Sequence, residues 1–257
     1  MNAREKYIAL RAILDKEVTR ILRIWQQTLL PSAITMTLYF LIFGAFIGSK
    51  IEGMGGVSYI QFIIPGLIMM AVITNAYSNV SSSFFGIKFQ RSVEELLVSP
   101  TPGYIIILGY VLGGMFRGLL VGAIVLLISL FFTKISLYNL AIVLVFIFLT
   151  SLVFSLAGFL NGMYAKKFDD VAIVPTFVLT PLTYLGGVFY SISLLPDFWK
   201  TVSLLNPIVY MVNGFRYGFL GISDINIWIG FIILAVLAVA LFWFSMHAMK
   251  KGIGLKS

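Results

Sequence analysis

The sequence has no cysteine, only one histidine and few charged residues. Of its 257 residues, 11% are charged, against about 25% in soluble domains. Without cysteine the chain can form no disulfide and offers no thiolate nucleophile. The single histidine, His247, argues against a histidine-based metal site. Because 60% of the residues are hydrophobic and the mean hydropathy is +1.02, the composition predicts an integral membrane protein.

Recognisable catalytic motifs are also missing. The sequence has no Gly-x4-Gly-Lys-Ser/Thr phosphate loop, although its tail reads GIGLKS, and no HExxH or GxSxG motif. We therefore expect no enzymatic activity and no cofactor or metal on this chain. The net charge of +8 would favour a nucleic-acid partner in a soluble protein. In a membrane protein the same residues indicate sidedness instead, so no nucleic-acid partner is expected.

Six stretches are long and apolar enough to cross a bilayer, whose core of about 30 Å needs roughly 20 apolar residues in a helix. They cover residues 24–49, 53–87, 96–116 with its continuation 118–133, 135–165, 171–196 and 225–249. We predict an all-α polytopic membrane protein with six transmembrane helices. The first stretch is too long for the apolar region of a signal peptide, so we expect it to be retained as the first span.

The basic residues favour one orientation. Six spans place both termini on one side of the membrane, and thirteen of the 18 lysines and arginines fall in segments on that side. The positive-inside rule therefore predicts that both termini are cytoplasmic. The thirteen residues are Arg4, Lys6, Arg11, Lys16, Arg20, Arg23, Lys88, Arg91, Lys166, Lys167, Lys250, Lys251 and Lys256.

None of the six stretches contains a carboxylate. Carriers coupled to protons or cations usually need an ionisable group at depth, where it can bind and release the ion. A self-contained secondary carrier or channel is therefore kept only as the alternative. The acidic residues are Glu5, Asp15, Glu17, Glu94, Glu95, Asp169 and Asp170 on the inner side, and Glu52, Asp197 and Asp224 on the outer side.

Two further segments flank the spans. Residues 3–23 (AREKYIALRAILDKEVTRILR) alternate apolar and charged residues at helical spacing, which predicts an amphipathic helix. It would either lie on the lipids of the inner leaflet or contact a cytoplasmic partner. Residues 186–223 are rich in aromatics and interrupted by proline and glycine. We expect short re-entrant helices there, with an ordinary external loop as the alternative.

A charged segment, KFQRSVEELLVSPTPG (88–103), interrupts the apolar chain between the second and third spans. It has the composition of a short amphipathic helix that Pro100 and Pro102 end. In the predicted orientation it is cytoplasmic, either a plain connection or a docking element for another protein. Its candidate contact residues are Arg91, Glu94, Glu95, Leu96, Leu97 and Val98.

The second and third spans carry unusual polar residues. Asn75, Ser78, Asn79 and Ser82 follow helical spacing and share one face of the second span. Small polar faces commonly pack helices together, but this face could also line a translocation route or a dimer interface. Arg117 is the one formal charge deep within a span, and it is either structural or part of such a route.

Three motifs carry a resemblance to a known family. FQRSVEELLVSPTPGY (89–104) resembles the cytoplasmic coupling helix of type 2 ABC exporter permeases. GGVFYSISLLPDFWKTVSLLNPIVYMVNGFRYG (186–218) resembles their outer signature, whose marker residues here are Leu195, Pro196, Asn206, Pro207 and Arg216. FIIPGLIMMAVITNAYSNV (62–80) resembles the YadH-like bacterial inner-membrane permeases within that family.

The resemblance implies a fold and a function. The whole chain, 1–257, would be a single permease domain that forms a homodimer in the bacterial inner membrane. Two copies of a separate ABC ATPase subunit would dock on residues 88–103 and would bind ATP and Mg, since this chain has no site for them. The complex would export an amphipathic substrate, such as a drug, a lipid or a glycan.

Overall fold

The computed structural model describes residues 1–48, 50–51 and 53–254, with the Leu97 side chain also outside the described part. The predicted outer acid Glu52 therefore lies outside the described residues. Within them the chain is helical and has no strand, apart from one isolated bridge between Met54 and Val57. The predicted all-α class is confirmed.

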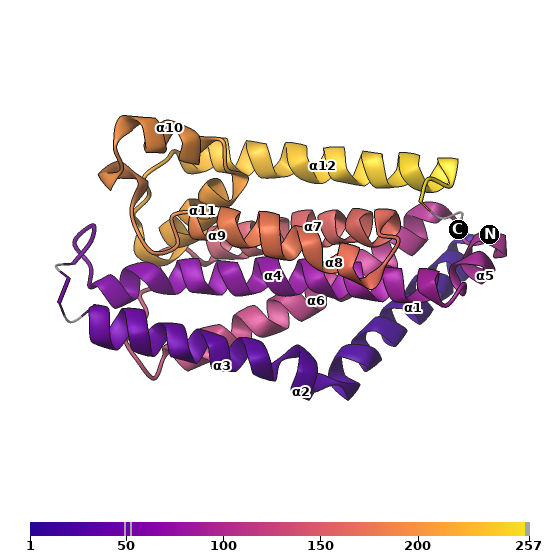
Figure 1. The fold of residues 1–257 in the computed structure, drawn as a ribbon, viewed down its shortest axis with the longest axis horizontal. Helices are drawn as coiled ribbons and strands as arrows, with labels where there is room; N and C mark the ends of the chain where they lie inside the picture. The colour runs from indigo at the N-terminus through magenta and orange to yellow at the C-terminus, as the bar shows by residue number, and fades with distance from the viewer. Residues whose placement is uncertain (49, 52, 255–257) are drawn as a thin grey trace.

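Five helical stretches are long and apolar enough to cross a membrane. They lie roughly along the long axis of the molecule, and both termini lie at the end where α5 (Val93–Val98) is found (Figure 1). The first stretch, Trp25–Ile47, consists of α2 (Trp25–Thr28), α3 (Leu30–Tyr39) and the π-helical η1 (Phe40–Ile47). The others are α4 (Tyr59–Phe89), α6 (Gly103–Ser129), α7 (Leu140–Tyr164) and α12 (Ile227–Lys251).

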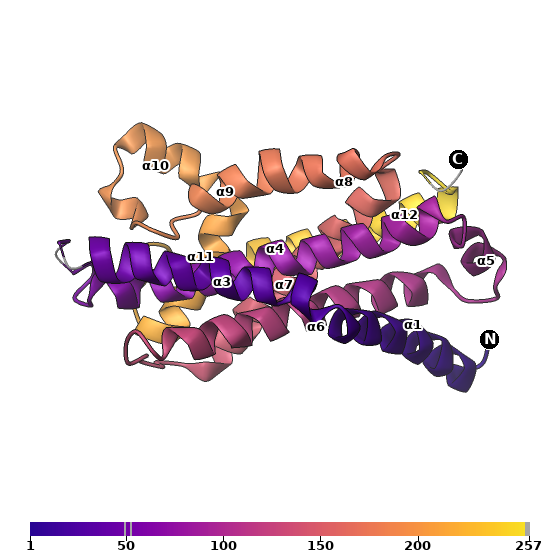
Figure 2. The same cartoon turned by 60° about the horizontal axis from the view of Figure 1, so that its bottom comes forward.

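The predicted span at 171–196 has a different form. Three short helices follow one another there: α8 (Phe168–Val174), the π-helical η2 (Pro175–Leu179) and α9 (Thr180–Tyr184). Proline has no N–H to donate and distorts the ladder, and the chain then turns at Gly187, whose φ is +71°. The helical run measures about 25 Å, short of a bilayer core of about 30 Å. This run of α8, η2 and α9 leads from the end of α7 toward α10 and lies alongside α4 (Figure 2).

Helix α4 is the buried centre of the bundle, and glycines let its neighbours approach closely. On α6, side chains at Gly114 and Gly118 would meet Val80 and Ala76 of α4. On α7, a side chain at Gly158 would meet the carbonyl oxygen of Tyr77. Small residues four apart on one helix face bring backbones together in membranes, where lipid provides no hydrophobic drive for helices to associate.

Replacing Gly158 by alanine is expected to destabilise the bundle by about 1–3 kcal/mol, because the new methyl group collides with the α4 backbone. The measurement is thermal unfolding of the purified protein in detergent. Gly86→Ala is the matched control, because a methyl group at Gly86 meets nothing within 4 Å. Equal unfolding temperatures for the two variants would contradict this packing.

A lysine joins the α5 ends of α4 and α7. Lys88 Nζ donates hydrogen bonds to the carbonyl oxygens of Met163 (2.7 Å) and Ala165 (2.6 Å). These carbonyls belong to the end of α7, where no intrahelical donor remains. The lysine therefore caps α7 from α4 and fixes the two helix ends to each other.

Helix α1 (Ala3–Arg23) begins with a capping box between Asn2 and Glu5 and packs along α6. Its face of Ile13, Glu17 and Ile21 is buried in the protein. Much of its remaining surface is exposed, so a contact with inner-leaflet lipid stays a prediction.

The outer segment 186–223 forms short helices rather than an extended loop. They are η3 (Ile192–Leu194), α10 (Asp197–Leu204) and α11 (Pro207–Leu220), and they gather at the end of the molecule opposite α5 (Figure 1). Helix α11 is largely buried and ends at Gly221, in the left-handed conformation. Whether these helices re-enter the membrane stays a prediction.

Candidate functional site

The predicted coupling segment contains α5, a helix of six residues between α4 and α6. Ser99 ends it, with extended backbone, and its Oγ donates a hydrogen bond to the Leu96 carbonyl oxygen. Pro102 then precedes α6. Its predicted helical character and its proline stop are therefore both found in the structure.

Most of the candidate contact residues of α5 face outward. Arg91, Glu94 and Glu95 are exposed, and the Val98 side chain is 88% exposed. Leu96 instead packs partly against the core, and the Leu97 side chain lies outside the described residues. Val98 thus stands in solvent near two carboxylates that form no ion pair among the described residues.

The residue that fixes α5 to the body is Val93, which the sequence reasoning missed. It is 3% exposed and belongs to the same cluster as Ile13, Ile87 and Ile106. A groove of about 310 Å³ opens beside it, lined by residues of α1, α4, α5 and α6, including Lys16, Glu95 and Tyr110. The α5 end of the molecule is thus a rigid surface with both charge and a recess.

Arg91 adopts the left-handed conformation, with φ of 59°, at the junction between α4 and α5. It is the one described non-glycine residue with positive φ. Such a conformation costs a residue with a Cβ roughly 1–2 kcal/mol. The sharp turn that presents α5 is therefore held at an energetic cost.

A buried polar network joins α1 to α4. Glu17 is fully buried, and its carboxylate accepts hydrogen bonds from Ser83 Oγ (2.6 Å), Arg20 Nη2 (2.9 Å) and Asn79 Nδ2 (3.5 Å). Arg20 Nη2 also donates to Asn79 Oδ1 (2.8 Å). Glu17 lies outside the apolar spans, as predicted, but it is buried against the bundle rather than exposed. Because Arg20 neutralises it, the site is not a free ion-binding carboxylate.

The predicted polar face of α4 divides into two parts. Asn75 and Asn79 are buried in helix contacts, and Asn75 Nδ2 donates to Ser32 Oγ of α3 (2.9 Å). Ser78 and Ser82 instead line a cavity of about 340 Å³ between α4, α6, α8 and η2. The packing role is therefore observed for the asparagines, whereas the two serines stay candidates for a translocation route.

Arg117 of α6 combines the two roles that the sequence left open. Its Nη2 donates to the carbonyl oxygen of Thr28 (3.1 Å), at the junction between α2 and α3. The same side chain lines the cavity of Ser78 and Ser82. Its Nε is buried and has no hydrogen-bond partner among the described residues. A positively charged side chain thus borders this cavity.

The outer signature residues organise the segment before α12. Leu195 and Pro196 precede α10, and Pro207 occupies the first turn of α11. Asn206 caps α11, since its Oδ1 accepts from the Ile208 amide (3.0 Å) while its Nδ2 donates to the Leu182 carbonyl oxygen (2.7 Å). These residues set the direction in which α11 enters the bundle.

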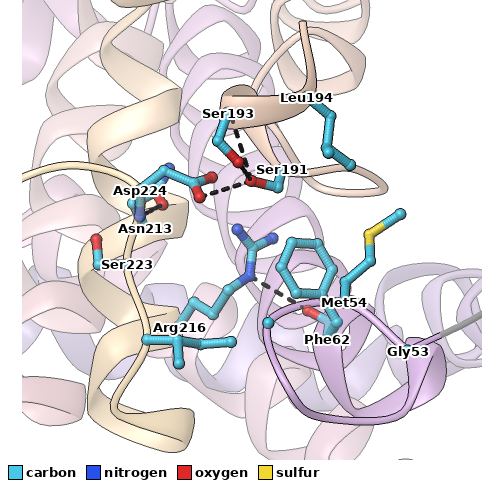
Figure 3. A pocket seen from close by; sticks show the side chains of 12 residues that line it. Gly53, Met54, Phe62, Ser191, Ser193, Leu194, Asn213, Arg216, Ser223 and Asp224 are labelled. Atoms are coloured by element: carbon cyan, nitrogen blue, oxygen red, sulfur yellow. Dashed lines mark hydrogen bonds between the residues drawn. The ribbon is translucent and has the colours of Figure 1, made fainter.

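Arg216 of α11 is the most deeply buried charge of the signature, at 1% exposure. It donates to the carbonyl oxygens of Gly187 (2.6 Å) and Phe62 (3.3 Å), and its guanidinium lies 3.9 Å from the centroid of the Phe62 ring. It also lines a cavity of about 380 Å³ at the outer end, with Asn213 and Asp224 (Figure 3). The signature arginine thus links three segments and reaches a cavity.

Taken together, these sites define a helical membrane protein with an exposed, charged helix at one end and polar cavities between its helices. No group of His, Cys, Asp or Glu suited to a metal ion occurs among the described residues. A bundle of apolar helices with polar cavities between them fits a membrane permease.

Comparison with known proteins gives the family. The ABC-2 type transporter family model matches residues 8–220, and the chain belongs to that family. It is 59% identical over 251 residues, 98% of both chains, to the inner membrane transport permease YadH of Escherichia coli K12. It is also 25% identical over 185 residues to nodulation protein J of Rhizobium leguminosarum bv. trifolii, covering 72% of this chain and 71% of that protein. The resemblance read from the sequence motifs is confirmed.

Proposed function

We propose that this chain is the membrane subunit of an ATP-driven exporter, powered by a separate ABC ATPase. The observation that carries the proposal is α5: its exposed Glu94, Glu95 and Val98 stand at the molecule's end, on a helix anchored by Val93. Apolar anchors bury in a partner and charges set its orientation. ATP and Mg would bind to that partner.

The orientation predicted from the basic residues also gives the arrangement of the chain in the membrane. The chain would lie in the inner membrane, as the YadH relative does by its name. The excess of basic residues at the end that carries α5 and both termini would place that end in the cytoplasm. The run of α8, η2 and α9 would provide the sixth crossing, and α10 and α11 would dip in from the outer side. Local thinning of the bilayer compensates for a short span at modest cost.

The complete transporter would contain two copies of this single permease domain and two ATPase subunits. A substrate would pass along the cavity of Ser78, Ser82 and Arg117, which is partly apolar and carries one cationic side chain. That combination suits an amphipathic molecule. Closure of the ATPase pair would push on α5 and be transmitted to α4 and α6.

Co-expression with a candidate ABC ATPase subunit from the same organism tests the proposal. We expect the two to purify as a complex with equal numbers of both subunits, and ATP hydrolysis by the complex to respond to its substrate. The alternative is a self-contained carrier or channel. Transport by this chain alone in liposomes, without ATP or ATPase, would establish that alternative and overturn the proposal.

A further inference from the structure

The cavity at the outer end contains a buried cation whose charge is not neutralised by contact. Arg216 is 1% exposed, yet its Nη1 has no hydrogen-bond partner among the described residues. It forms no ion pair in the described part of the chain, where the two ion pairs are Arg11–Asp15 and Arg20–Glu17. A buried charge is costly unless it is paired, so this guanidinium offers a strong site for an anionic acceptor.

An acid stands near it on the same cavity wall. Figure 3 shows the guanidinium pointing into the cavity, with the Asp224 carboxylate and the Ser191 hydroxyl on one side and the Phe62 ring on the other. The Asp224 oxygens accept from Ser191 Oγ (2.6 Å) and the Ile192 amide (2.9 Å). Both donors are neutral, and each oxygen retains a lone pair. The acid is therefore fixed in place but not neutralised.

The two charges limit the kind of ligand. A simple anion would be attracted by Arg216 and repelled by Asp224, and the reverse holds for a simple cation. A ligand with both charges would satisfy both groups, and charge-assisted hydrogen bonds are roughly twice as strong as neutral ones. The cavity of about 380 Å³ falls within the size of small-molecule sites, about 300–1,000 Å³.

One part of the cavity lining is apolar and exposed. Leu194 lines it and is 67% exposed, and the exposed rings of Phe198 and Trp199 come four and five residues later in the chain, on α10. Aromatic side chains of this kind gather at the membrane–water interface. A ligand with acyl chains beside its charged headgroup would therefore contact both parts of this surface.

We propose that the Arg216 cavity binds a phosphate ester that also carries a primary ammonium group, as the headgroup of an aminophospholipid does. The phosphate accepts from Arg216 Nη1, and the ammonium donates to Asp224. The apolar residues beside the cavity hold the start of the acyl chains. This site is distinct from the cavity of Arg117 and does not depend on docking of an ATPase.

Native mass spectrometry of the full chain, purified in detergent, tests this site with short-chain phospholipids. Phosphatidylethanolamine is expected to bind at least about tenfold more tightly than phosphatidylglycerol, which lacks the cation. It should equally exceed phosphatidylcholine, whose quaternary ammonium has no N–H to donate. Equal affinities for the three lipids would overturn the proposal.

Asp224→Asn is the decisive variant, since it keeps the shape of the side chain and removes its charge. We expect it to reduce the preference for phosphatidylethanolamine over phosphatidylglycerol to less than about threefold. Asp197→Asn, at the exposed start of α10, is the matched control and should leave the preference unchanged. An unchanged preference in Asp224→Asn would also overturn the proposal.

A second variant and a soluble probe complete the test. Arg216→Gln should weaken binding of all three lipids, and because Arg216 also holds Phe62 and Gly187, its result counts only alongside that of Asp224→Asn. Glycerophosphoethanolamine, which has no acyl chains, identifies the source. Binding as tight as that of the lipid would assign the site to a soluble solute, and much weaker binding assigns it to the membrane lipid.

Discussion

Replacing Val98 by aspartate is expected to abolish stimulation of the partner ATPase while leaving the permease folded. The side chain is 88% exposed, so the isolated chain loses little, within about 0.5 kcal/mol. In the proposed complex the same side chain would be covered, and burying a new carboxylate without a partner costs several kcal/mol. A loss of 3 kcal/mol corresponds to about 150-fold weaker association.

The measurement is ATP hydrolysis by the co-purified complex, with the amount of inserted permease determined in parallel. Leu205→Asp is the matched control, because Leu205 is 83% exposed in the outer segment, away from α5. We expect that control to keep stimulation near the wild-type level. Wild-type stimulation by the Val98→Asp variant would show that α5 is not the docking element.

Replacing Glu17 by alanine is expected to lower the stability of the protein by about 3–5 kcal/mol. The substitution removes the acceptor of Ser83 and the one acidic partner of Arg20, and it leaves a partly buried guanidinium without its counter-charge. It also opens space against Gly113 of α6, which the Glu17 side chain contacts closely. Helix α1 should then separate from the bundle more readily.

Thermal unfolding in detergent measures the stability, and limited proteolysis of α1 tests where it is lost. Asp15→Ala is a close control: it removes an ion pair two residues away on the same helix, but Asp15 and Arg11 are both 67% exposed. An exposed pair of this kind contributes about 0–1 kcal/mol. If the two variants unfold at the same temperature, the Glu17 network is not a major source of stability.

The position of Glu17 could have been found in the sequence. It lies four residues after Ile13 and four before Ile21, so it occupies the middle of the apolar face of its helix. A carboxylate at such a position must be paired, and Arg20 was available one turn away. Its partners on α4 could not be predicted, because they depend on how α1 packs against distant parts of the chain.

For the predicted span at 171–196, in contrast, the sequence did not predict the structure that forms. Its apolar composition predicts one helix long enough to cross the bilayer. The structure turns at Gly187 and builds short helices instead. Hydropathy identified the five other apolar helices because length and composition are properties of local sequence. Where the helix ends depends on the carbonyl groups that Asn206 and Arg216 bind from later in the chain.

The candidate sites also divide into features that local sequence predicts and features that depend on tertiary packing. The charged run and the two prolines predicted a short helix between the second and third spans, and the structure confirms it as α5, while its docking role stays a prediction. The split of Ser78 and Ser82 from Asn75 and Asn79 was not predictable, because all four residues share one helix face. Only the positions of α3, α6 and α8 determine which of them contact protein and which line a cavity.

The hydrogen bonds from Lys88 to the end of α7 affect how a force on α5 would reach the bundle. Only Gln90, Arg91 and Ser92 separate α4 from α5, and the turn at Arg91 is held at a cost in energy. A force on α5 thus acts as a torque at the end of α4, whose 31 residues form a lever arm of about 45 Å. Because Lys88 joins the end of α7 to this lever, a force transmitted through α5 would move the ends of both helices together.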